Sequence, residues 1–157
     1  MLLAFIITLS TRGQHAPEYP IGWEEKEAKP RNIALDRIAS FRKTAVEFGY
    51  SKSFDFKGHF NDFVGVTKHD TNPKVIVQLK LTSLNRAQYL ITKPIHPTQT
   101  HSKDPQGNYI FELHVIPNRE LEAKILEFGP DMEVLEPIWL REQVADKVRC
   151  MWALYSD

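Results

Sequence analysis

The sequence predicts an α+β protein in which a short, strand-rich N-terminal part precedes a β-α-β-β-α-β domain with one added C-terminal helix. Two observations predict this class. From residue 74 onward, hydrophobic patterns of period two alternate with patterns of helical period in that order, which is the order of a ferredoxin-like domain. The length of 157 residues, with 42% hydrophobic and 25% charged residues, suits one globular domain or two small ones.

The first ten residues, MLLAFIITLS, contain an apolar run that predicts a buried strand over residues 1–9. The run lacks the basic start and the small-residue cleavage site of a signal peptide, and it is about half the length of a membrane span. We therefore expect a cytoplasmic protein without membrane contact. Because a chain that begins inside a core strand looks like a fragment, we also expect that an N-terminal part has been lost.

Two less regular segments follow the first strand. Residues 11–30 contain three prolines, two glycines and a cluster of charges, a composition typical of a long exposed loop. In the next stretch, RNIALDRIASFRKT, Ile33 and Leu35 alternate with their neighbours, which predicts a strand that ends in a turn. Residues 47–73 are rich in phenylalanine and are predicted to form a linker that packs between two domains, a simpler explanation than base stacking.

The pattern from Lys74 begins with a strand, a helix and a hairpin. KVIVQLKLT alternates as a β-branched strand, and LNRAQYLIT has helical spacing that stops before Pro94. HPTQTHSK and NYIFELHVI flank the turn DPQG and predict a hairpin.

A helix, a strand and a second helix complete the domain. PNRELEAKILEFG predicts a helix with Asn118 as its N-cap and Gly129 as its C-terminal stop, and MEVLEP predicts the last strand. The final helix covers residues 137–155 and has Pro137 in its first turn. One stripe of this helix is apolar and consists of Leu140, Val144, Val148, Met151 or Trp152, and Tyr155.

The motifs do not favour catalysis, and we expect no enzyme, no cofactor and no metal. Cys150 is the single cysteine and is predicted to be a buried, inert thiol. His96 and His101 are five residues apart, which on a strand points them to opposite faces, and both are predicted to be surface or hairpin residues. The sequence has no glycine-rich phosphate loop. A solvated helix face is the expected place of three carboxylates, Glu120, Glu122 and Glu127.

Two groups of basic residues are candidates for ligand contacts. The 20 basic and 20 acidic residues cancel, so any nucleic-acid role needs a local patch. Arg31, Arg37 and Arg42, with Lys43, concentrate positive charge, and two arginine forks beside one strand could hold a phosphate. A structural rim in which Asp36 pairs with an arginine is the alternative. The second, weaker group is Arg86, Lys93 and His96, for which a solvated face is the alternative.

Several of these stretches resemble one family of bacterial transcriptional regulators, the WYL-domain proteins. RNIALDRIASF is similar to their arginine-containing strand motif, and FDFKGHFNDFVGV resembles their linker. VIVQLKL, YLITKPIHPTQ and ELEAKILEFGPDMEVLEPIWLREQV are similar to the C-terminal extension of the family, the WCX domain. The last stretch is the most specific, and the resemblance covers residues 31–155, with residues 1–9 in the place of the Trp-Tyr-Leu strand.

The resemblance implies a domain organisation. Residues 1–46 are then a partial Sm-like β-barrel of the WYL type, residues 47–73 a linker, and residues 74–157 a WCX-like, ferredoxin-like domain. Met1, Leu2 and Leu3 replace the start of the family's Trp-Tyr-Leu strand, so the Trp-Tyr pair is absent, as are the first half of the barrel and the helix-turn-helix.

The resemblance also implies a function. The family's barrel is thought to sense ligands, so this chain is expected to bind a nucleotide or a single-stranded nucleic acid as its effector. Arg31 and Arg37 match the family's basic strand positions, and Arg42, Lys93 and His96 complete the candidate contacts. A partial barrel exposes strand edges, and we therefore expect a homodimer formed by strand exchange between N-terminal segments. A dimerisation module without a ligand of its own is the alternative function.

Overall fold

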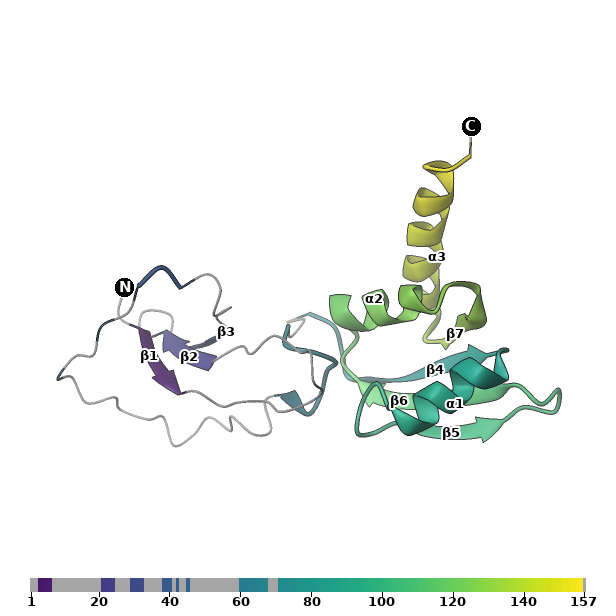
Figure 1. Cartoon of the computed structure of the whole chain (residues 1–157), viewed down its shortest axis with the longest axis horizontal. Helices are drawn as coiled ribbons and strands as arrows, with labels where there is room; N and C mark the ends of the chain where they lie inside the picture. Colours follow the sequence, from purple (N-terminus) through teal and green to yellow (C-terminus); the bar gives the residue numbers. More distant parts are fainter. Residues whose placement is uncertain are drawn as a thin grey trace. The chain divides into compact units, whose positions relative to one another are not determined.

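The structure is a computed structural model, and the chain in it divides into two compact units, Met1–Lys57 and Gly58–Asp157. Figure 1 shows both units and their helices and strands. The structure describes residues 3–6, 21–24, 29–32, 38–40, 42, 45, 60–67 and 71–156.

Three short strands of the first unit pair in an antiparallel sheet of order β1-β2-β3. They are β1 (Leu3–Ile6), β2 (Ile21–Glu24) and β3 (Lys29–Asn32). The strand predicted in residues 1–9 is confirmed over β1. The long loop predicted for residues 11–30 is wrong at β2, because Ile21–Glu24 pairs with a strand on each side. Pro30 is compatible with β3, since a proline is tolerated in an edge strand.

The second unit contains a four-stranded antiparallel sheet of order β5-β6-β4-β7. Its strands are β4 (Val75–Leu81), β5 (Thr100–Lys103), β6 (Tyr109–Val115) and β7 (Met132–Glu136). Its helices are α1 (Leu84–Thr92), α2 (Arg119–Glu127) and α3 (Ile138–Ala153), with a short 3-10 turn, η3 (Gly129–Asp131). The α+β class and the order of elements predicted from residue 74 onward are confirmed.

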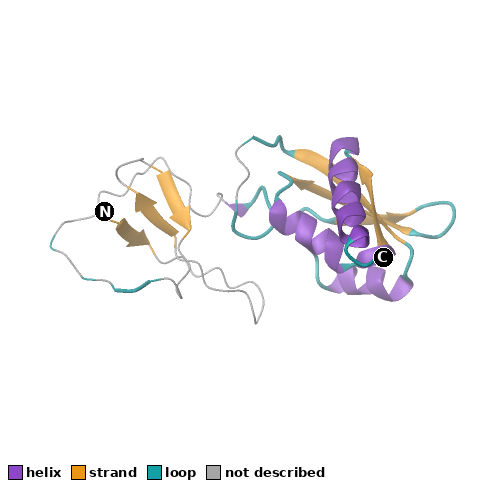
Figure 2. Ribbon diagram, turned by 90° about the horizontal axis from the view of Figure 1, so that it is seen from above, coloured by secondary structure: helices purple, strands orange, loops and turns teal. Residues whose placement is uncertain are grey.

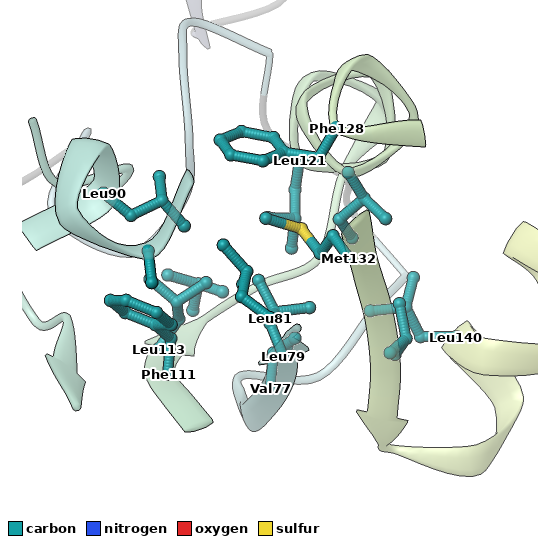
Figure 3. Packing of buried hydrophobic residues seen from close by; sticks show 14 residues of the cluster. Val77, Leu79, Leu81, Leu90, Phe111, Leu113, Leu121, Phe128, Met132 and Leu140 are labelled. Carbon is teal, nitrogen blue, oxygen red and sulfur yellow. The ribbon is translucent and has the colours of Figure 1, made fainter. Parts of the chain in front are cut away.

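The core of the second unit lies on one face of its sheet. Alternate residues of β4 point to this face, and Val77, Leu79 and Leu81 are fully buried. Val77 pairs in register with Leu113 of β6, so the buried residues of both strands share the face. Helices α1 and α2 both lie on that side (Figure 2). Figure 3 shows side chains of the helices, Leu90 among them, packed against the strand residues.

Asn118 connects the N-terminus of α2 to the segment that precedes the sheet. Its side-chain oxygen accepts a hydrogen bond from the N–H of Leu121 at 2.9 Å, which confirms the predicted N-cap. Its side-chain nitrogen donates to the carbonyl oxygens of Val64 and Thr67, each at 2.7 Å. Residues 60–67 are therefore attached to α2, and Phe63 among them is buried.

Helix α3 differs from the prediction in two ways. Pro137 is its N-cap, so the proline precedes the first turn. The apolar stripe contacts the sheet only in the first half of the helix, where Leu140 is buried and Val144 is half-buried. Figure 1 shows why, since the second half of α3 extends away from β7 and the rest of the sheet.

Candidate functional site

The basic residues predicted in the first unit have different outcomes. Arg31 lies on β3, where its backbone pairs in register with Gly22 of β2. Arg42 is exposed. Arg37 lies outside the residues that the structure describes. The structure therefore leaves the role of these three arginines as a prediction.

Lys93, predicted in the second group, lies at the C-terminal end of α1. It is the C-cap residue, its backbone N–H donates to the carbonyl of Tyr89 at 2.8 Å, and its side chain is exposed. A positive charge is favourable at this end of a helix, where carbonyl groups carry the negative end of the helix dipole. The Lys93 Nζ atom lies 5.3 Å from the centroid of the Tyr89 ring, within the range of a cation–π contact.

Arg86, Tyr89 and Lys93 follow one another along a single face of α1, because residues three and seven positions apart share a face. Arg86 places its guanidinium carbon 4.7 Å from the ring centroid of Phe128, the C-cap of α2. The Tyr89 and Phe128 rings are neighbours, with centroids 6.4 Å apart. These four residues form an aromatic pair with a cation at each end, which we call the cation–aromatic strip.

The cation–aromatic strip combines one buried side chain with side chains that solvent can reach. Phe128 is buried, whereas Tyr89 is 43% exposed. The Arg86 side chain donates two long hydrogen bonds, to the Asp131 carboxylate and to the Glu127 carbonyl oxygen, each at 3.4 Å. Arg86 and Lys93 are about 10 Å apart along the helix axis at 1.5 Å per residue. An exposed ring between two cations can stack on a base while the cations contact phosphates.

The sequence prediction missed two residues of this strip. Tyr89 could have been found from the spacing of Arg86, Tyr89 and Lys93 in LNRAQYLITK, since all three positions fall on one helical face. Phe128 could not, because it comes from a different helix and only packing brings it to Tyr89.

His96 belongs to a packed loop, and its predicted surface location is wrong. It is 3% exposed, and its Nδ1 lies 2.8 Å from the hydroxyl oxygen of Thr98. The backbone N–H of Thr98 donates to the same Nδ1 at 3.3 Å. The Thr98 hydroxyl oxygen accepts a hydrogen bond from the backbone N–H of His114 at 2.9 Å, which attaches the loop to β6. His101 and His114 are exposed, as predicted for His101.

Two further predictions about reactive groups are corrected. Glu122, expected on a solvated face, is 7% exposed and forms an ion pair with Lys147 of α3. Cys150, expected to be buried, is exposed because it lies in the half of α3 that extends beyond the sheet. Among the described residues, no three histidine, cysteine or acidic side chains are grouped so that they could hold a metal ion.

Comparison with known families gives one match. The family model of the WCX domain matches residues 73–152. The match begins two residues before β4 and ends within α3, so it includes the four-stranded sheet and the cation–aromatic strip. A comparison with curated proteins found no match. In the described part of the chain, no helix has both the length and the apolar character that crossing a membrane requires.

Proposed function

The chain belongs to the WCX domain family, and on this premise we propose that it is the C-terminal effector-sensing and assembly part of a bacterial WYL-type transcriptional regulator. In this proposal, residues 1–46 are a partial Sm-like barrel and residues 47–73 a linker. The antiparallel β1-β2-β3 sheet supports a small-barrel origin for the first part. The regulator is cytoplasmic and acts by binding, without catalysis.

We also assign residues 74–157 to the ferredoxin-like arrangement. Two observations support the assignment. The elements follow one another as strand, helix, strand, strand, helix and strand before α3. The first strand of the series, β4, lies in the middle of the sheet between the third and the fourth, which is how two interleaved β-α-β units pair.

The cation–aromatic strip is the observation that carries the proposal of an effector. The exposed Tyr89 ring offers a surface for one base, and its position between Arg86 and Lys93 favours a ligand with negative charge on both sides of that base. A single-stranded nucleic acid or a nucleotide has this combination. Arg31, Arg37 and Arg42 are separate candidate contacts within the first unit, at the strand motif that resembles the regulator family.

The test is a titration of the full chain into a fluorescein-labelled single-stranded DNA, followed by fluorescence anisotropy at two salt concentrations. We expect binding that weakens with salt, by about 0.7 logarithmic units per contacted phosphate for each tenfold increase. Tyr89→Ala is expected to weaken binding by roughly 5- to 150-fold, the equivalent of about 1–3 kcal/mol per stacked base. Lys93→Ala should reduce the salt dependence by about one phosphate contact.

Matched variants separate the strip from general effects of mutation. Leu84→Ala removes an exposed apolar side chain from another face of α1, and Arg119→Ala removes an exposed charge from α2. Both are expected to bind as the original chain does. A separate Arg31→Ala/Arg37→Ala variant tests the first unit. Absence of binding at low salt, or equal binding by all variants, would contradict the effector proposal.

A module that assembles without a ligand is the second candidate function, favoured by the exposed apolar side chains of α3. In both candidates the chain is a homodimer, and strand exchange between N-terminal segments is one route to it. Light scattering at micromolar concentration should give twice the 18.2 kDa mass of one chain. A dimer that binds no labelled DNA would favour the second candidate, and a monomer would contradict both.

A further inference from the structure

The apolar stripe of α3 continues beyond the sheet that its first half covers. Leu140 and Val144 pack on the core, and the next positions of the same helical face are Val148, Met151 and Trp152, with Tyr155 one residue beyond the C-cap Leu154. These four side chains, which we call the distal stripe, are 49%, 49%, 70% and 87% exposed. The face is therefore continuous in sequence, but only its first half has a partner within the described part of the chain.

The charges of α3 lie outside the distal stripe. Arg149 pairs with Asp146 on the other side of the helix. Lys147 reaches back to Glu122 of α2, and Arg141 contacts Glu133 and the carbonyl of Val134 on β7. The four α3 residues in these three ion pairs are thus engaged within their own chain. The distal stripe can be buried against another apolar surface without burying a charge.

The size of the distal stripe decides how unusual its exposure is. An aromatic side chain has about 150–250 Å² of surface to bury. With Trp152 and Tyr155 largely exposed and Val148 and Met151 half exposed, the distal stripe exposes on the order of 500 Å². That value lies near the upper end for the largest apolar patch of a monomeric protein, roughly 300–600 Å². Two such patches in contact would bury about 1,000 Å², the lower bound for a specific interface.

We propose that the distal stripe is the contact with a second copy of this chain, in which the two α3 helices pack antiparallel about a two-fold axis near Met151 and Trp152. Val148 then faces the partner's Tyr155, and Met151 packs on the partner's Trp152. A two-fold contact requires a surface that matches itself. An uncharged stripe meets this condition, since no like charges are brought together and none is buried without a partner. The inference rests on the assembly part of the proposed function and names its surface.

Sedimentation velocity of the full chain over a concentration series tests the contact. The original chain should be a dimer at micromolar concentration. Trp152→Glu places a charge in the contact twice, once in each copy, and is expected to raise the dimer Kd at least about a hundredfold. The control is Leu84→Glu, which makes the same change at an exposed apolar residue in the first turn of α1 and should leave the mass unchanged.

Cysteine cross-linking tests the geometry, and it does so without relying on a disruptive variant. In a Cys150→Ser background, Met151→Cys lies near the proposed axis and should form a disulfide between copies on mild oxidation. Val148→Cys in the same background should not. At 1.5 Å per residue, two such cysteines lie about 10 Å apart along the helices, beyond the reach of a disulfide.

Each outcome bears on a different part of the proposal. A monomeric original chain, or a dimer that Trp152→Glu leaves intact, would overturn the α3 contact. A cross-link at Val148→Cys but not at Met151→Cys would overturn the antiparallel register. A dimer that persists in Trp152→Glu would leave assembly through another surface, so the proposed function would survive. Loss of DNA binding in Tyr89→Ala with an unchanged mass concerns the effector alone.

Discussion

At the scale of single residues, Asp104 closes the turn between β5 and β6. The side-chain nitrogen of Asn108 donates to one oxygen of this carboxylate at 2.9 Å. The backbone N–H groups of Gln106 and Asn108 donate to the other, at 3.0 and 2.8 Å. The hydrogen bond from the Asn108 side chain is the largest cause of a lowered Asp104 pKa. Desolvation is the second-largest effect and raises the pKa, whereas the two backbone hydrogen bonds and the charge of Lys80 lower it further. The turn predicted from DPQG is thus held by an ionised aspartate.

The lowered pKa predicts a stability that depends on pH. Because the folded state favours ionised Asp104, its contribution is complete above the pKa of the unfolded chain, about 3.9, and is lost as the pH falls through the lower folded pKa. Urea unfolding should therefore show the largest stability difference between the original chain and Asp104→Asn near pH 7. The difference should shrink below about pH 4. A difference that stays constant from pH 7 to pH 3 would contradict this role.

Two glycines with positive φ give a matched pair at the same scale. Gly65 has φ +74° and Gly107 has φ +86°, so alanine is strained at both positions. An added Cβ at Gly65 would lie 2.9 Å from the Glu120 Cγ, whereas an added Cβ at Gly107 meets nothing within 4 Å. We expect Gly107→Ala to cost about 1 kcal/mol and Gly65→Ala roughly 2–3 kcal/mol. Urea midpoints with unchanged m-values measure both, and equal costs would contradict the contact with Glu120.

At the scale of elements, α3 is stabilised on one side of its first half. Leu140 is fully buried in the core, whereas Ile138, two residues earlier, is exposed. Leu140→Ala is therefore expected to cost about 2–5 kcal/mol, and Ile138→Ala less than about 1 kcal/mol. Chemical denaturation monitored by circular dichroism gives both values. Similar losses in the two variants would mean that α3 is not attached to the sheet through Leu140.

At the scale of the whole molecule, the second unit has a core of its own. All fourteen buried residues of its hydrophobic core lie in the range from Val77 to Leu140. Residues 60–67 are hydrogen-bonded to Asn118, the N-cap of α2. We therefore predict that a fragment of residues 58–157 unfolds cooperatively in urea without the first unit. An m-value of about 1–3 kcal/mol/M is expected for a domain of this size. A fragment without a sigmoidal transition would show that the first unit is required for folding.

Local patterns in the sequence determined much of the second unit. The alternation in KVIVQLKLT predicts which face of β4 is buried, because side chains of a strand alternate between faces. Asn118 and the DPQG turn were predictable for a similar reason, since each acts on backbone groups within four residues. In the first unit, the proline and glycine content of residues 11–30 concealed β2, whose pairing depends on distant residues.

By itself, then, the sequence determined the α+β class, the order of elements from residue 74 onward and the N-cap Asn118, because hydrogen bonding and periodicity operate over a few neighbouring residues. Only the tertiary structure placed Phe128 beside Tyr89, buried Glu122 against Lys147, and enclosed His96 in a loop bonded to β6. The tertiary structure also decided that the apolar stripe of α3 extends beyond the sheet that its first half covers. Helical periodicity shows which side of a helix is apolar, whereas the extent of the neighbouring elements decides how much of that side finds a partner.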